Sequence, residues 1–274
     1  YCSLSGYGQT GPYRLTSGHD LNYISYAGIL GLTAHKGQTP TIPGVQIADI
    51  GGGALYAAIG ILIALMGVKQ NGVGQYVDTS MLDGAVSWLP VLANDYFVKG
   101  VSPKAAENIL NGQNACYEVY ETADGRYISI GAIEPHLWAN FCDAIGKEEF
   151  KLWQRDLTKQ DEMFACLREM FKSKTQAEWI EKLTGVDCCW APVKNLEEVF
   201  ADPQVLARDM VYEMTDPAGC YGSVKMIGSA VKLSEAPARQ ELFPPRKGEH
   251  NAEYLKAVGY SDEQIAEFEK NGII

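Results

Sequence analysis

Two side chains near the start of the chain have the chemistry of acid–base catalysts, His19 and Asp49. An imidazole titrates close to neutral pH without much tuning, so His19 could give or take a proton during a reaction. A single histidine at a helix start is also commonly hydrogen-bonded to backbone. Residue type alone therefore makes His19 a candidate and nothing more.

Asp49 stands in a more informative context, because Gly51, Gly52 and Gly53 follow it and an apolar run over 54–66 comes next. A carboxylate at a helix start is stabilised by free N–H groups and by the helix dipole, and an ordinary N-cap aspartate would fit this pattern. Three consecutive glycines, however, cost helix stability. Their advantage is that backbone can approach a ligand closely. The pattern therefore predicts that Asp49 is a functional residue.

The elements that position these two residues follow from hydrophobic periodicity and turn residues. We expect a glycine-rich loop over 1–18, an amphipathic helix beginning at His19 and a polar loop over 33–46. The apolar run 54–66 predicts a buried helix, because it is shorter than the ~20 residues that cross a bilayer. We therefore expect no membrane contact.

The rest of the chain predicts a mixed α/β or α+β architecture. Its clearest element is a hairpin of residues 119–121 and 127–130, with Asp124 and Gly125 in the turn. The remaining expected elements are helices at 81–94, 135–145, 161–183, 195–200, 203–210, 251–259 and 262–270, and strands at 76–80, 187–193 and within 211–233.

Composition narrows the class of function. The 274 residues carry a net charge of −11, and phosphate binding requires clustered positive charge, so nucleic acid is not an expected partner. The seven cysteines contain no C-x-x-C pair, which favours reduced thiols in a cytoplasmic protein over a metal site. The chain begins at Tyr1 in what resembles a core strand. We therefore expect the sequence to be the C-terminal portion of a longer protein.

Several segments together resemble the family III CoA-transferase (CaiB/BaiF) superfamily, most closely its α-methylacyl-CoA racemase branch. Each segment is weak evidence alone, whereas their number and order along nearly the whole chain are specific. The segments are Ser3–Pro12, Gly18–Tyr23, Asp49–Gly53, Gly74–Asp83, Ala132–Pro135, Pro192–Val193 with Asp202–Gln204, and Gly248–His250.

The resemblance implies a fold as well as a chemistry. We expect part of a Rossmann-like large domain over 1–98, with the catalytic segment and linker helices, and a small α+β domain over 99–210. Residues 211–274 would return to the large domain. Family members are longer at the N-terminus and form interlocked homodimers, so much of the CoA-binding surface is expected to lie outside this chain.

The resemblance also assigns roles. In the racemase branch His19 and Asp49 would be the acid–base pair that moves the α-proton of an acyl-CoA through an enolate, and Glu134 would orient the imidazole and raise its basicity. The segment of Gly18, Asp20, Leu21, Asn22 and Tyr23 would bind the thioester substrate. Acyl-CoA is the expected substrate, and no metal or separate cofactor is implied.

Two alternatives stay open from the sequence. In the transferase branch the aspartate corresponding to Asp49 is a nucleophile that forms acyl anhydride and CoA thioester intermediates, so Asp49 does not separate the two reactions. The chain could also be an inactive fragment, or one subunit of a split enzyme, because of where it begins. The acyl group is not specified by the sequence, since apolar pockets discriminate poorly between chain lengths.

Overall fold

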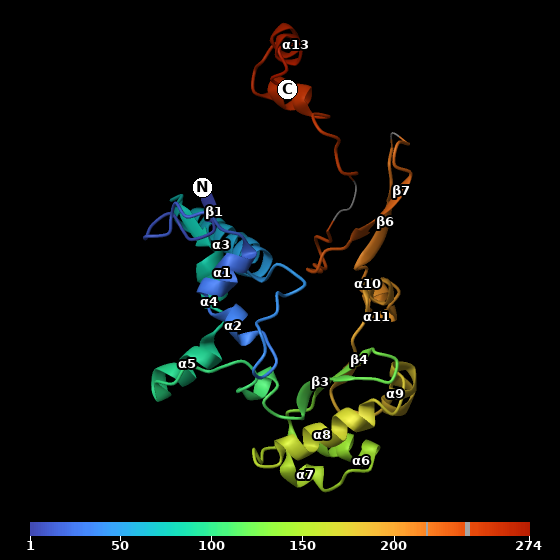
Figure 1. The fold of residues 1–274 in the computed structure, drawn as a ribbon. Coiled ribbons are helices and arrows are strands. Elements are labelled where there is room, and N and C mark those ends of the chain that lie inside the picture. The colour runs from blue at the N-terminus through green and yellow to red at the C-terminus, as the bar shows by residue number, and fades with distance from the viewer. Residues whose placement is uncertain (218, 239–241) are drawn as a thin grey trace. The chain divides into compact units, whose positions relative to one another are not determined.

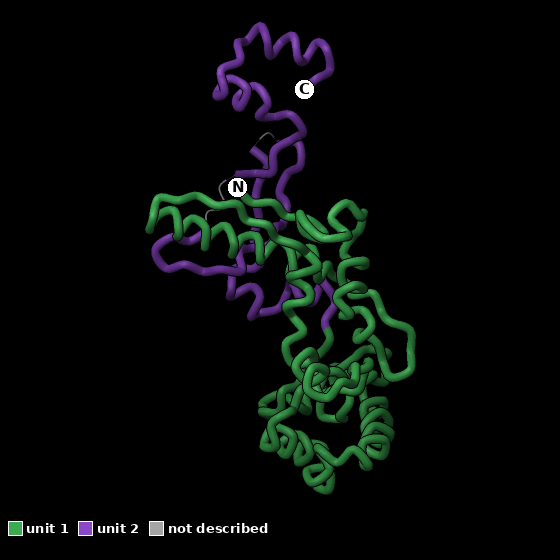
Figure 2. Tube along the Cα trace, turned by 90° about the vertical axis from the view of Figure 1, so that its left-hand side faces the viewer, with its two compact units in different colours: residues 1–193 green, residues 194–274 purple. Residues whose placement is uncertain are grey.

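The computed structural model describes residues 1–217, 219–238 and 242–274. These described residues form a mixed α/β fold with three small sheets. It separates into two compact units, residues 1–193 and residues 194–274 (Figure 2).

The first half of unit 1 contains one parallel strand pair joined by a helical crossover (Figure 1). Parallel strands require such a crossover, because a tight turn can only join antiparallel neighbours. Residue Cys2 pairs with Val77 and Ser5 with Ser80. The elements in chain order are β1 (Cys2–Ser5), α1 (Asp20–Tyr26), α2 (Ile29–Leu32), η1 (Ile47–Ala54), α3 (Leu55–Asn71), β2 (Val77–Ser80), α4 (Met81–Val86) and α5 (Pro90–Lys99).

The glycine-rich segment that the sequence places at a helix start forms a π-helix, η1, which continues directly into α3. Glycine is required here because α4 crosses η1 with almost no space between the backbones. A Cβ on Gly52 would lie 2.8 Å from the backbone N of Ala85, and a Cβ on Gly84 would overlap the carbonyl of Gly52. Around this crossing a small core forms, here called the alanine cluster, of Tyr23, Ile24, Ala27, Ala48 and Ala85.

Helix α3 differs from its sequence-based prediction. It is longer than the predicted 54–66 segment, and most of its apolar side chains are exposed: Leu62 is 60% exposed and Met66 is 72% exposed. Its apolar residues surround the helix, so hydrophobicity alone could not show which faces have a neighbour in this chain. The continuous stretch Ile47–Asn71, 25 residues, is also long and apolar enough to cross a membrane by length and composition.

The second half of unit 1 contains a three-stranded antiparallel sheet in the order β3-β4-β5 and the helices packed with it. The predicted hairpin is present, with Glu121 paired to Tyr127 and Gly125 in a left-handed conformation at φ 71°. The elements are η2 (Ile109–Asn111), β3 (Tyr117–Glu121), β4 (Tyr127–Gly131), α6 (Pro135–Ile145), α7 (Phe150–Trp153), α8 (Gln160–Phe171), α9 (Gln176–Leu183) and β5 (Trp190–Pro192).

This half has a much larger core, here called the aromatic cluster. Trp138 and Phe171 are fully buried, and the indole of Trp179 donates a hydrogen bond to the carbonyl of Phe171 at 2.9 Å. The cluster comprises Ala115, Cys116, Tyr120, Ile128, Ile130, Ala132, Leu137, Trp138, Phe141, Cys142, Phe150, Met163, Leu167, Phe171, Trp179, Leu183 and Cys188.

In its described residues, unit 2 contains one antiparallel strand pair and short helices. Residue Val211 pairs with Ile227 and Thr215 with Ser223. Its elements are α10 (Leu196–Phe200), α11 (Pro203–Ala207), β6 (Val211–Thr215), β7 (Ser223–Ile227), α12 (Asn251–Ala257) and α13 (Asp262–Lys270).

The division into 1–98, 99–210 and 211–274 stays a prediction. Within unit 1 the alanine cluster lies entirely before residue 98 and the aromatic cluster entirely after it. The predicted return segment over 211–274 includes residues 218 and 239–241, which lie outside the described residues.

Candidate active site

Asp49 lies in the first turn of η1, half-buried among the elements that surround the alanine cluster. Its Oδ1 atom is buried and has no hydrogen-bond partner among the described residues. Burial raises the pKa of the Asp49 carboxyl above its ordinary value of 3.8, the charge of Asp20 raises it further, and His19 lowers it. An unpartnered carboxylate with a raised pKa is suited to exchanging a proton or attacking a carbonyl.

Asp20 approaches the same turn from α1. Its Oδ1 atom accepts two backbone hydrogen bonds, from the N–H of Ala48 at 2.6 Å and from the N–H of Asp49 at 3.0 Å. The chain between Asp20 and η1 comprises the rest of α1, helix α2 and the loop that carries Pro40 and Pro43, so the contact is formed between segments distant in sequence. The carboxylate of Asp20 therefore fixes the start of η1.

His19 is the exposed N-cap residue of α1, with extended backbone at φ −132° and ψ 175°. Its own N–H donates to Oδ1 of Asn22 at 3.1 Å, which fixes the backbone at the start of the helix. The charge of His19 acts on Asp49, so the predicted acid–base pair occupies one electrostatic environment.

Tyr23 contacts the backbone of Gly18, the residue that precedes His19. Its ring is buried, and its hydroxyl donates to the carbonyl of Gly18 at 2.5 Å. A Cβ on Gly18 would lie 2.8 Å from both the Tyr23 ring and the hydroxyl of Tyr7, so glycine is needed beside His19. Burial raises the pKa of Tyr23, and the charges of Tyr7 and Asp49 raise it further.

The predicted substrate-binding segment is therefore occupied largely by internal contacts. Gly18, Asp20, Asn22 and Tyr23 each contact neighbouring backbone or rings, and the carbonyl of Leu21, a residue 37% exposed, accepts from the hydroxyl of Ser25 at 2.6 Å. Their assignment to substrate binding stays a prediction. What the structure adds is that they hold His19 and Asp49 in place.

Glu134, the third predicted catalytic residue, lies elsewhere in unit 1. It is the exposed N-cap residue of α6, next to the aromatic cluster. Among the described residues, no hydrogen bond or ion pair joins it to His19 or Asp49, and it is not among the charges that shift the pKa of Asp49. Within a single chain the structure brings His19, Asp20 and Asp49 together and leaves Glu134 apart.

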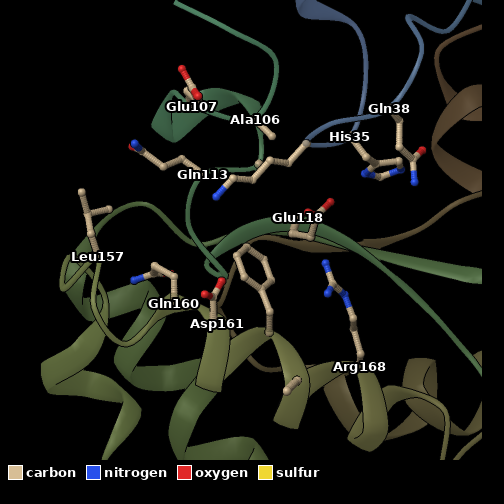
Figure 3. Close-up of a pocket in the computed structure, with 14 residues that line it drawn as sticks. His35, Gln38, Ala106, Glu107, Gln113, Glu118, Leu157, Gln160, Asp161 and Arg168 are labelled. Carbon is tan, nitrogen blue, oxygen red and sulfur yellow. The ribbon is translucent and has the colours of Figure 1, made fainter.

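Two cavities lie away from His19 and Asp49. One, of about 790 Å³, lies between the loop carrying His35 and helix α8 (Figure 3), and the other, of about 840 Å³, borders it. The first is lined by acidic and basic side chains alike: Glu107, Glu118 and Asp161 with His35, Lys36 and Arg168. This balance favours neither an anionic nor a cationic ligand. In the part of the chain that the structure describes, no group of three His, Cys, Asp or Glu residues is arranged to hold a metal ion.

Sequence reasoning missed two residues at the crossing of η1 and α4, Gly84 and Trp88. Gly84 permits that crossing, and the ring of Trp88 packs against Gly51 so closely that a Cβ there would overlap it. A glycine inside the helical pattern over 81–94 was the available signal for Gly84, since such a glycine marks a close approach.

Comparison with known proteins shows where this arrangement belongs. Residues 1–251 match the model of CoA-transferase family III. The chain is a member of that family. The family is enzymatic and includes racemases and CoA-transferases among the relatives of this chain.

Relatives named as racemases and relatives named as CoA-transferases match this chain at similar sequence identity. The chain is 34% identical to an acyl-CoA transferase of Fusarium pseudograminearum, over 100% of the chain and 61% of the relative. It is 30% identical to human alpha-methylacyl-CoA racemase, over 100% of the chain and 71% of the relative. It is also 30% identical to human succinyl-CoA:glutarate CoA-transferase, over 100% and 63% respectively. The chain thus spans about three fifths to seven tenths of these relatives.

A solved structure agrees. A CAIB/BAIF family protein from Brucella suis superposes with a TM-score of 0.77 at 28% identity, covering 94% of this chain and 67% of that one.

Proposed function

We propose that the protein is an acyl-CoA racemase or epimerase that interconverts (R)- and (S)-2-methylacyl-CoA by moving the α-proton. The observation that carries this proposal is Asp49 itself: its Oδ1 atom is buried without a hydrogen-bond partner among the described residues, burial raises its pKa, and the charge of His19 acts on it. Burial raises the pKa of the Asp49 carboxyl above its ordinary value, which is the direction that proton transfer at neutral pH requires. Racemases are among the relatives of this chain in the same family, which also supports racemisation as the reaction.

The reaction needs one base and one acid on opposite faces of the α-carbon. The base removes the α-proton, and the electron pair of the C–H bond moves into the thioester carbonyl to form an enolate. The acid then returns a proton from the other face. His19 and Asp49 exchange these roles between the two directions, which leaves the enzyme ready for either enantiomer. The enolate forms on the substrate itself, so the mechanism requires no redox cofactor.

The test is α-proton exchange in deuterated water with a 2-methylacyl-CoA and the whole enzyme. We expect deuterium incorporation at the α-carbon and loss of stereochemical purity. His19→Ala should reduce exchange about 10²- to 10⁴-fold, the usual contribution of a general acid–base group. His250→Ala, at the start of α12 in unit 2, is the matched control and should leave exchange unchanged. A protein that moves CoA between acids without exchange would contradict the proposal.

The alternative is a CoA-transferase, which the 34% identity to an acyl-CoA transferase favours. Here the Asp49 carboxylate attacks the thioester carbonyl, CoA leaves as the thiolate, and a mixed anhydride forms. The thiolate then attacks the Asp49 carbonyl, releasing the first acid and leaving an aspartyl-CoA thioester for the second acid to attack. Hydroxylamine should trap that thioester as a mass change at Asp49, and His19→Ala should leave CoA transfer largely intact.

We also propose that the active enzyme is a homodimer in which Glu134 of one chain completes the site of the other. The supporting observation is that, within a single chain, Glu134 is the N-cap residue of α6, which contributes to the aromatic cluster, whereas His19 is the N-cap residue of α1, which contributes to the alanine cluster. Mixing His19→Ala with Glu134→Ala should then restore exchange, because each mixed dimer holds one intact site. Two inactive variants that stay inactive when mixed would contradict this arrangement.

A chain that is an inactive fragment or one subunit of a split enzyme remains the third candidate, and the exposed apolar faces of α3 favour it. Calorimetric titration of the 274-residue chain with CoA separates it from the other two. Micromolar affinity would count against a fragment, whereas binding that appears only after a second polypeptide is added would support a split enzyme.

A further inference from the structure

We propose that Asp20 is a positioning residue: its carboxylate ties the first turn of η1 to α1 and so fixes where Asp49 lies relative to His19. The inference rests on the proposed role of Asp49 and goes beyond it, because the resemblance to the family assigns Asp20 to substrate binding.

The geometry comes from the hydrogen bonds. The first N–H groups of any helix lack partners within the helix. In η1 the N-cap residue Gln46 makes no side-chain capping bond, and the bonds come instead from Oδ1 of Asp20, which accepts from Ala48 at 2.6 Å and Asp49 at 3.0 Å. Asp20 therefore caps a helix that begins more than twenty residues further along the chain.

The same contact joins the two candidate acid–base groups mechanically. His19 directly precedes Asp20, and its backbone is held by Asn22. Asp49 directly follows Ala48, whose N–H is held by Asp20. One carboxylate thus links the backbone beside His19 to the backbone of Asp49. Misplacing such a group by about 1 Å can cost on the order of 10²-fold in rate.

Asp20 also acts on the charge of Asp49. After burial, its negative charge is the next cause that raises the pKa of the Asp49 carboxyl. At the start of α1, His19 lowers the pKa of Asp49, and the charge of Asp49 in turn raises the pKa of Tyr23. The other elements packed on η1 also carry titratable groups, and among the described residues none of these makes a hydrogen bond or ion pair with Asp49. Asp83 on α4 is exposed, Asp78 on β2 accepts from the N–H of Gln9, the Tyr56 hydroxyl on α3 accepts from Ser87, and Cys2 lies on β1.

Two substitutions separate position from charge. Asp20→Asn keeps an oxygen that can accept both N–H groups and removes the charge, whereas Asp20→Ala removes both. Asp83→Asn is the matched control, since Asp83 is an exposed carboxylate in the first turn of α4, which packs on η1. The full chain is labelled with ¹³C-aspartate, and three quantities are measured: protection of the Ala48 and Asp49 amides against hydrogen exchange, the Asp49 titration, and the kcat and KM of α-proton exchange.

We expect Asp20→Ala to lose protection of both amides and to lower kcat on the order of 10²-fold with little change in KM. Asp20→Asn should keep the protection and most of the kcat, and should lower the pKa of Asp49. Asp83→Asn should change none of these. The amide and titration results do not require turnover, so they test the inference even if no exchange activity is found.

Two results would overturn the inference. One is an Asp20→Ala variant whose Ala48 and Asp49 amides stay protected as in the wild type. The other is a rise in KM at unchanged kcat, which would assign Asp20 to substrate binding as the family resemblance implies.

Discussion

The two clusters of unit 1 are built on opposite principles. The aromatic cluster fills its interior with large side chains such as Trp138, Phe171 and Trp179, all essentially inaccessible to solvent. The alanine cluster instead achieves contact by removing side chains, so that the backbones of η1 and α4 meet at Gly52 and Gly84. The first arrangement stabilises by burying apolar area, about 25 cal/mol per Å². The second buries little, and its benefit is the precise placement of Asp49.

The largest effect should follow truncation of the aromatic cluster. Trp179→Ala removes a buried ring that lies tilted against Phe171 and the hydrogen bond to its carbonyl, and should cost about 3–5 kcal/mol in the free energy of unfolding. Leu152→Ala, at a side chain 87% exposed on α7, is the control and should cost less than about 0.5 kcal/mol. Chemical denaturation measures both values.

Hydrogen exchange on Trp179→Ala tests the comparison itself. If the clusters are independent, the amides of β3 and β4 lose protection while those of Ala48 and Asp49 keep it. Equal loss of amide protection at both clusters would show that they unfold as one cooperative unit. The clusters would then differ in their residues but not in their stability.

A smaller loss of stability, with a larger loss of function, should follow a change at the helix crossing. Gly84→Ala places a Cβ against the carbonyl of Gly52, so η1 and α4 must separate. We expect a cost of about 1–3 kcal/mol together with loss of most activity, because Asp49 moves with η1. Gly67→Ala on α3 is the control, since its Cβ would meet only Gln75 at 3.7 Å and alanine favours a helix. Full activity in Gly84→Ala would show that the crossing does not position the site.

The sequence predicted best the features that depend on neighbouring residues. The hairpin follows from the turn at Asp124 and Gly125, and α6 occupies the expected residues from Pro135 to Ile145. The predicted helix over 161–183 is two helices, α8 and α9. Its break was readable, because Thr175 and Glu178 form a capping box that starts a new helix.

Features that join distant segments could not be predicted. Apolar character located α3, but whether its faces are covered depends on what packs there, and most of its side chains are exposed. The glycines after Asp49 indicated a close approach without naming its partner, α4. The sequence contains Asp20, but it could not predict the hydrogen bonds that Asp20 accepts from Ala48 and Asp49. Those bonds form because the intervening segment brings η1 next to α1.

The smallest predicted effect concerns the free-energy cost of holding the Asp49 carboxylate half-buried beside the alanine cluster. Burial and the charge of Asp20 raise the pKa of Asp49 in the folded state above the value of 3.8 for a free side chain. The folded state therefore binds this proton more tightly than the unfolded state. Its contribution to stability is present below pH 3.8 and is lost as pH rises through the folded pKa.

Asp49→Asn cannot ionise and should escape that loss. Relative to the wild type it should gain stability between acidic and neutral pH, by up to about 1 kcal/mol, while losing activity. Asp83→Asn, at an exposed carboxylate, should show no such pH-dependent gain. Melting temperatures from pH 3.5 to 8 give the measurement. Parallel curves for wild type and Asp49→Asn would mean that the ionised Asp49 carboxylate does not lower the stability of the folded state. The position of Asp49 beside the alanine cluster would then carry no stability cost.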